Sequence, residues 1–178
     1  KSVKDFIQDL VPKAGWYPNA EGKLVKDNKK LELTFTIAGG STDHPAFTMF
    51  NKAKVKLENC GFTITVKNDV NALRKLTTGQ LEVWAAAWSS TIDPDMYQVY
   101  HKNSNASSVK AWGYNHIREN ESAYWMETEI LNKMSEIIDD ARETDVQADR
   151  TALYEEAMGY VLDLAIELPV YQRQQLYA

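Results

Sequence analysis

An apolar stretch at residues 81–88, interrupted only by Glu82, constrains the fold of this chain more than any other segment. Continuous apolar runs of this length are typical of strands buried on both faces, as in a sheet covered by helices. Upstream, residues 31–37 and 62–66 alternate apolar with polar side chains, as half-buried strands do. The sequence therefore predicts two half-buried strands followed by a fully buried one.

Segments with helical spacing separate these predicted strands. Ser41 or Thr42 can cap a helix that ends near Gly61, and a shorter helix ends at Gly79. The resulting order of strand, helix, strand, helix, strand predicts an α/β fold, a layered domain with a mixed sheet flanked by helices. We find no internal repeat, so we expect one domain over residues 1–178.

The remaining segments complete the predicted domain. A helix is expected at 1–14, an exposed turn or loose hairpin at 19–30, a short helix after Pro94, and a polar loop at 101–108. Two amphipathic helices follow, the second with a capping box from Thr144 to Gln147, and residues 168–171 are expected to be extended. The predicted buried stripes are Met126, Ile130, Met134, Ile137 and Ala141 in the first helix, and Ala148, Leu153, Ala157, Tyr160, Val161 and Leu164 in the second.

Charge and residue usage exclude several classes of function. The 178 residues carry a net charge of −5 with no long charged block, which disfavours nucleic acid or an anionic membrane surface as a partner. No apolar run approaches the ~20 residues that span a bilayer. The single cysteine, Cys60, is expected to be a small buried residue, and three scattered histidines give no metal-ligand spacing. Because the chain begins at Lys1, we expect a mature or excised piece of a longer protein.

The end of the apolar run and the polar loop after it, residues 85–97, hold the candidate binding residues. Ligands of α/β sheets tend to lie at the carboxyl ends of strands, and this loop follows such an end. Small and hydroxyl side chains let a ligand approach the backbone, and Trp88 offers a flat apolar wall. An alternative is that Trp88 packs in the core and Asp93 only caps the next helix. The predicted ligand-binding residues are Ala87, Trp88, Ser89, Ser90, Thr91 and Asp93.

An enzymatic role has little support in the sequence. Asp93 and Asp95 lie two residues apart at a predicted helix start, where acids stabilise the helix dipole more often than they form an acid–base pair. No phosphate-binding loop or nucleophile–histidine spacing is present. Several aromatic residues are candidates to line a cleft, and the sequence does not sort them from core residues: Trp84, Trp112, Tyr114 and Trp125.

Four stretches in this order resemble the carboxy-terminal lobe of the oligopeptide- and dipeptide-binding proteins that serve ABC importers. A helix end with a Gly-aromatic pair precedes a polar loop and a strand, and LENCGFTITV is similar to the family's helix–glycine–strand joint. TTGQLEVWAAAWSSTIDPDMY resembles its central signature, and the last stretch resembles its closing helix and Leu-Pro-aromatic strand. The stretches are residues 14–36, 57–66, 77–97 and 150–178.

The resemblance implies one lobe of a two-lobe, periplasmic-binding-protein-like fold that closes on its ligand. It implies that an extended peptide pairs with the backbone of residues 87–90 of this lobe. The chain departs from the family at Thr91, where members that hold a peptide amino terminus carry Asp. Asp93 stands one position short of the usual acid–proline pair, and a basic residue near Ala85 is absent.

Together these patterns predict a solute-binding component of an ABC importer, without catalysis or cofactor. Its expected partners are a small-molecule ligand, in the first place a peptide, and the importer's membrane subunits. We expect an extracytoplasmic monomer that is membrane-anchored in its full-length form. Two alternatives remain open: a secreted carbohydrate-active enzyme that uses Asp93, and an interaction module without a small ligand.

Overall fold

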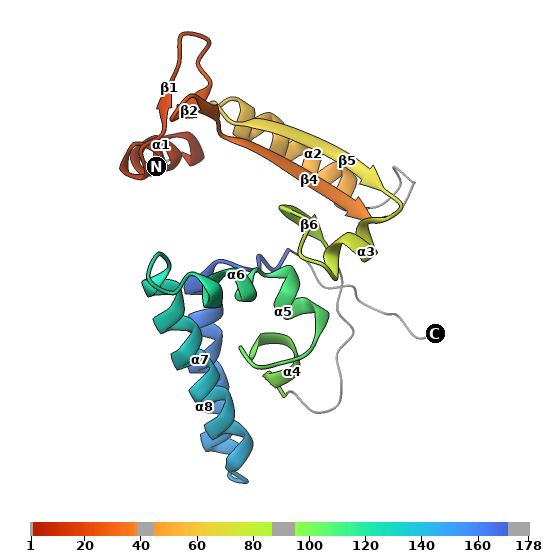
Figure 1. Cartoon of the computed structure of the whole chain (residues 1–178), viewed down its shortest axis with the longest axis vertical. Coiled ribbons are helices and arrows are strands. Elements are labelled where there is room, and N and C mark those ends of the chain that lie inside the picture. Colours follow the sequence, from red (N-terminus) through yellow and green to blue (C-terminus); the bar gives the residue numbers. More distant parts are fainter. Residues whose placement is uncertain (1, 39–44, 87–94, 171–178) are drawn as a thin grey trace. The chain divides into compact units, whose positions relative to one another are not determined.

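A computed structural model of the chain describes residues 2–38, 45–86 and 95–170 (Figure 1). The chain divides into two compact units, and each is described by itself. The first unit comprises Lys1–Leu76 and Gln80–Ser89, and the second comprises Thr77–Gly79 and Ser90–Ala178. The predicted helix cap at Ser41 or Thr42 lies outside the described residues. A single domain over the whole chain stays a prediction.

A parallel sheet organises the first unit. Strands β4 (Glu32–Ala38), β5 (Thr63–Asp69) and β6 (Val83–Ala85) form a three-stranded sheet in the order β5-β4-β6 within the described residues. Parallel strands need crossovers, and helices α2 (Pro45–Glu58) and α3 (Ala72–Leu76) lie between them in the chain. The predicted strand–helix–strand–helix–strand order of an α/β unit is therefore confirmed.

The alternation along β4 assigns one helix to each face of this sheet. Phe35 and Ile37 are buried with residues of α2, and the ring of Phe35 meets that of Phe50 edge-on with the centroids 5.0 Å apart. Thr36 and Ala38 point to the opposite face, where they share a pocket with α3. Figure 1 shows α2 running along the β4–β5 pair. The core of this unit is therefore the layer between α2 and the sheet.

Strand β6 differs from the prediction of a fully buried strand at 81–88. Within the described residues it spans only Val83–Ala85, each residue of which is half-buried. It lies at the outside of the described sheet, where β4 is its hydrogen-bonded neighbour. The Glu82 carboxylate accepts a hydrogen bond from the backbone N–H of Thr34 at 2.6 Å. This side chain therefore binds a backbone N–H of β4 next to the point where the pairing of β4 with β6 begins. The expectation of burial on both faces is wrong because the apolar run serves an outer strand.

A small antiparallel sheet precedes the parallel one. Its strands are β1 (Tyr17–Pro18), β2 (Leu24–Lys26) and β3 (Lys29–Lys30), which correspond to the predicted turn or hairpin. Helix α1 (Val3–Leu10) begins with a capping box from Ser2 to Asp5, and the 3₁₀ helix η1 (Pro12–Ala14) follows it. The predicted amino-terminal helix is thus present in two pieces.

The second unit is helical in its described part. Its helices are α4 (Tyr97–Tyr100), α5 (Ser107–Ala111), α6 (Tyr114–Glu119), α7 (Trp125–Glu143) and α8 (Gln147–Leu164). Figure 1 shows α7 and α8 side by side as a helical hairpin. Their core includes Leu131, Met134 and Ile138 of α7, and Ala157 and Val161 of α8. Helices α5 and α6 were not predicted, because the polar sequence from 101 to 108 suggested a longer loop.

The predicted buried stripe of α7 is partly wrong. Met134 and Ala141 are buried as expected, but Met126 is exposed and the remaining buried residues are Leu131, Ser135 and Ile138. Ser135 is buried because its hydroxyl donates to the carbonyl of Leu131 at 2.8 Å and accepts from the N–H of Lys102 at 3.1 Å. A prediction from hydrophobicity places serine on the exposed face of a helix, so the predicted buried face of α7 was rotated away from Ser135.

Helix α8 also differs from its prediction at its start. Its N-cap is Val146, and the hydroxyl of Thr144 accepts from the N–H of Val146 instead of capping the helix. The backbone is extended at Thr144 and Val146, so Gln147 is the first helical residue and the predicted capping box is wrong. Ala157 and Val161 are buried, Leu153, Tyr160 and Leu164 are half-buried, and Ala148 is exposed.

A buried histidine joins α4 to α7 in the second unit. His101 is 2% exposed and its ring stacks on Tyr97 at 4.2 Å between centroids. The N–H of Asn103 donates to Nδ1 at 3.0 Å, so the proton of the neutral ring lies on Nε2. Nε2 in turn lies 3.2 Å from Oδ2 of Asp139. The geometry therefore suits the neutral imidazole.

We expect the stability of the chain to fall as the pH drops from neutral through about 6.5. Burial lowers the pKa of His101, while Asp139 partly offsets this effect. The unfolded chain then binds the proton at a higher pH than the folded chain, so stability is fully present above the unfolded pKa. Urea unfolding midpoints at a series of pH values will check this. His101→Gln should flatten the dependence, whereas the exposed His116→Gln should leave it intact; equal slopes in all three proteins would contradict the assignment.

Candidate functional site

The three strands of the parallel sheet end at one edge. Strands β4, β5 and β6 end at Ala38, Asp69 and Ala85, and the register places Ala38 opposite Asp69. Because the strands are parallel, the segments that follow them start from this common edge. The edge is the place where an α/β sheet most often binds a ligand, and it is the candidate site of this chain.

The predicted ligand-binding residues follow directly in the sequence. Strand β6 leads through Ala86 into the segment 87–94. Ala87, Trp88, Ser89, Ser90, Thr91 and Asp93 all lie outside the described residues, so their roles stay predictions. Strand β6 ends at Ala85, earlier than the strand predicted to continue to Trp88.

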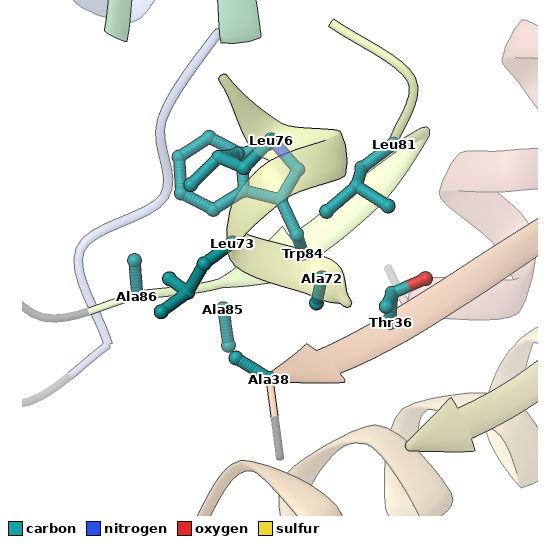
Figure 2. A pocket seen from close by; sticks show the side chains of 9 residues that line it. All are labelled: Thr36, Ala38, Ala72, Leu73, Leu76, Leu81, Trp84, Ala85 and Ala86. Atoms are coloured by element: carbon teal, nitrogen blue, oxygen red, sulfur yellow. The ribbon is translucent and has the colours of Figure 1, made fainter. Parts of the chain in front are cut away.

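A pocket of about 230 Å³ adjoins this edge on the α3 face of the sheet. Figure 2 shows α3 lying across the strands, with Leu73 and Leu76 on the helix and Trp84 on β6. Thr36 and Trp84 are register partners on neighbouring parallel strands, so their side chains share this face. The pocket is lined by Thr36, Ala38, Ala72, Leu73, Leu76, Leu81, Trp84, Ala85 and Ala86.

The lining of the pocket is apolar apart from the Thr36 hydroxyl. Leu73 and Leu76 lie three residues apart in α3, a spacing that places them on one helix face. Leu73 is 68% exposed, so its side chain is accessible at the pocket. The pocket therefore presents an open apolar surface to any molecule at the carboxyl edge.

A charged cluster fastens α3 to the end of β5. The Asp69 carboxylate accepts hydrogen bonds from Lys75 Nζ at 2.5 Å and from the N–H of Asn71 at 2.8 Å, and Lys67 Nζ lies 3.8 Å away. The hydrogen bond from Lys75 is the largest cause that lowers the pKa of Asp69. These contacts hold the helix that carries Leu73 and Leu76 against the sheet.

The structure shows which of the four candidate aromatic residues line a pocket and which belong to the core. Trp84 lines the pocket, Tyr114 is fully buried in the core of the second unit, and Trp112 packs against that core. Trp125 is 63% exposed at the start of α7. Leu73 and Leu76 were not predicted as site residues, because only the strand register shows which face of the sheet α3 covers.

The described residues hold no cluster of three or more His, Cys, Asp or Glu side chains suited to a metal ion. Cys60 is half-buried in the turn after α2, whereas the prediction had it buried. Among the described helices, none combines the length and the apolar character that crossing a bilayer requires.

Comparisons with known proteins give a fold but no sequence family. No family model matches the chain, and no curated protein matches it. Among solved structures, NikZ from Campylobacter jejuni in complex with Ni(L-His) has a TM-score of 0.69 at 17% identity. The oligopeptide-binding protein AppA from Bacillus subtilis, in complex with a nonapeptide, has a TM-score of 0.68 at 18% identity. A nickel ABC transporter protein from Bacillus halodurans has a TM-score of 0.61 at 17% identity.

The extent of these similarities defines what they establish. Each covers 93% of this chain, but only 31% of NikZ, 30% of AppA and 31% of the Bacillus halodurans protein. The chain therefore has the fold of a part of these proteins and spans less than a third of their length. The predicted α/β fold is confirmed, and the resemblance to these proteins holds at the level of fold.

Proposed function

We propose that this chain is one lobe of an extracytoplasmic solute-binding protein that delivers its ligand to the membrane subunits of an ABC importer. The observation that carries the proposal is the similarity of fold over 93% of the chain to AppA and NikZ, two proteins solved with bound ligands. In this role the chain binds and releases a solute without catalysing a reaction. The complete protein is a monomer with a second lobe, anchored at the outer side of the membrane.

The proposed ligand site is the carboxyl edge of the parallel sheet. Residues Ala87, Trp88, Ser89 and Ser90 line the ligand, and Thr91 and Asp93 complete the loop. A peptide is the favoured solute, because AppA was solved with a nonapeptide and extended peptides can pair with strand-like backbone. Support for this placement comes from the end of β6 immediately before the segment and from the open pocket beside it.

Two lobes are needed for tight binding in this proposal. A wall of a cleft excludes little water on its own, and closure of two walls around the ligand buries most of its surface. The isolated chain should therefore bind a peptide weakly or not at all, although it carries the residues of one wall.

Calorimetric titration of the two-lobe protein with a mixture of short peptides tests the function. We expect binding in the micromolar range or tighter for the two-lobe protein, against little heat for this chain alone as control. Circular dichroism of both samples establishes that each is folded. A folded two-lobe protein that releases no heat would contradict the peptide as ligand, and the presence of Thr91 in place of an aspartate would explain the loss of the ammonium partner.

A further inference from the structure

The pocket beside the carboxyl edge has the size of a side chain and not of a whole solute. Pockets that enclose a drug-sized ligand measure roughly 300–1,000 Å³. The pocket under α3 measures about 230 Å³. Apolar cavities of about 150 Å³ are large enough to bind benzene. The volume therefore suits one branched aliphatic or aromatic group.

The lining of the pocket is selective for such a group. A polar group that enters an apolar pocket loses its hydrogen bonds to water and finds few replacements. Thr36, which is buried, supplies the one side-chain hydroxyl, and the other lining side chains are leucine, alanine and tryptophan. Leu73, Leu76 and Trp84 provide the largest apolar surfaces of the lining.

The position of the pocket connects it to the proposed ligand site. Ala86 belongs to the lining and immediately precedes Ala87, the first of the residues proposed to line the ligand. Ala38 brings the end of β4 into the same lining. The pocket therefore lies beside the carboxyl edge at which the solute is proposed to bind.

We infer that this pocket receives a branched aliphatic or aromatic side group of the solute and makes the protein selective for ligands that carry one. The inference rests on the proposed function, because it assigns a chemical class to the ligand of that site. For a peptide ligand, the group is a side chain such as that of leucine or phenylalanine. The apolar lining then discriminates against a polar side chain of equal size.

Binding of matched tripeptides by the two-lobe protein tests the inference. The probes are alanine tripeptides in which each position in turn carries leucine or asparagine, two side chains of similar size and opposite polarity. At the position that enters the pocket, leucine should bind about tenfold tighter than asparagine, since a hydrophobic pocket discriminates by factors of this order. The measured quantity is the ratio of the two dissociation constants.

Two substitutions locate the selectivity in this pocket. Leu73→Asp places a charge in the lining and should bring the leucine-to-asparagine ratio close to one. Val70→Asp is the matched control, because Val70 is 78% exposed, lies three residues before Leu73 and is absent from the lining. Ala86→Phe adds a large side chain at an exposed position of the lining and should abolish the preference without introducing a charge.

The outcomes separate the two proposals. A leucine preference that survives in Val70→Asp and disappears in both Leu73→Asp and Ala86→Phe supports the inference. Tripeptides that bind with no preference for leucine at any position overturn the inference and leave the proposed function standing. A preference that Leu73→Asp and Ala86→Phe do not alter also overturns it. If none of the tripeptides binds, the proposed peptide ligand fails and the inference fails with it.

Discussion

Replacement of Gly61 by alanine is expected to lower the free energy of unfolding of this chain by about 2–5 kcal/mol. Gly61 lies between α2 and β5 with φ at +95°, a region that costs a residue with a Cβ roughly 1–2 kcal/mol. A Cβ there would lie 2.8 Å from the carbonyl oxygen of Gly22 and 3.0 Å from Cγ of Leu24. Such overpacking adds on the order of 1–3 kcal/mol.

The contacts around Gly61 cannot shift easily to admit a methyl group. The carbonyl of Gly61 accepts from the N–H of Leu24 at 2.8 Å, and Leu24 is itself buried. The N–H of Gly22 donates to Asn19 at 2.9 Å, which fixes the backbone of the hairpin turn. Gly61 therefore marks the point where the antiparallel sheet packs against the joint between α2 and β5.

Gly22→Ala is a matched control for this prediction. Gly22 also has a positive φ, +75°, but a Cβ built on it meets no atom within 4 Å. It should cost only the conformational part, about 1–2 kcal/mol. Urea unfolding followed by circular dichroism measures both variants. Equal losses of stability in the two would contradict the close packing at Gly61.

The strands and helices of the first unit could be predicted because their patterns are local. Alternation of Leu33, Phe35 and Ile37 marks β4, and Gly61 separates α2 from β5. The partial burial of β6 could not be predicted, because an apolar sequence alone does not reveal whether its strand lies in the centre or at the outside of a sheet. That information lies in the pairing of Phe35 with both Val66 and Val83, which joins residues far apart in the sequence.

Two polar residues of the second unit are buried against expectation from a hydrophobicity pattern, and one of them lies in the stripe of α7. Ser135 is buried through two hydrogen bonds, one of them to the backbone of Lys102, a residue of a distant segment. His101 is buried through its contacts with Asp139 and Asn103. The contacts of Ser135 with Lys102 and of His101 with Asp139 join residues more than 30 positions apart, so local sequence patterns do not reveal them.

The candidate site was predicted in part. A strand was predicted at this place in the sheet, but it was expected to reach Trp88, whereas β6 ends at Ala85. The pocket was not anticipated beyond the inclusion of Trp84 among possible cleft residues. Its lining combines residues of β4, α3 and β6, and only their register brings Thr36 and Trp84 to the same face.

Replacement of Trp88 by alanine is expected to weaken ligand binding by the two-lobe protein by about 2 kcal/mol or more. This corresponds to an increase of roughly thirtyfold in the dissociation constant. The physical reason is the loss of a large apolar wall against the ligand, since buried tryptophan side chains dominate many binding sites. Trp125→Ala is the matched control, because Trp125 is 63% exposed at the start of α7 and outside the proposed site.

Calorimetric titration of Trp88→Ala beside the wild-type protein tests most directly whether the segment 87–94 forms the wall of a solute site. The measurement needs the tightest-binding peptide and a parallel urea unfolding curve for each variant. We predict that Trp88→Ala has a dissociation constant roughly thirtyfold larger than that of the wild-type protein, with little change in the unfolding midpoint. Trp125→Ala should retain the wild-type affinity. An unchanged affinity of Trp88→Ala together with a lowered unfolding midpoint would place Trp88 in the core and contradict the account.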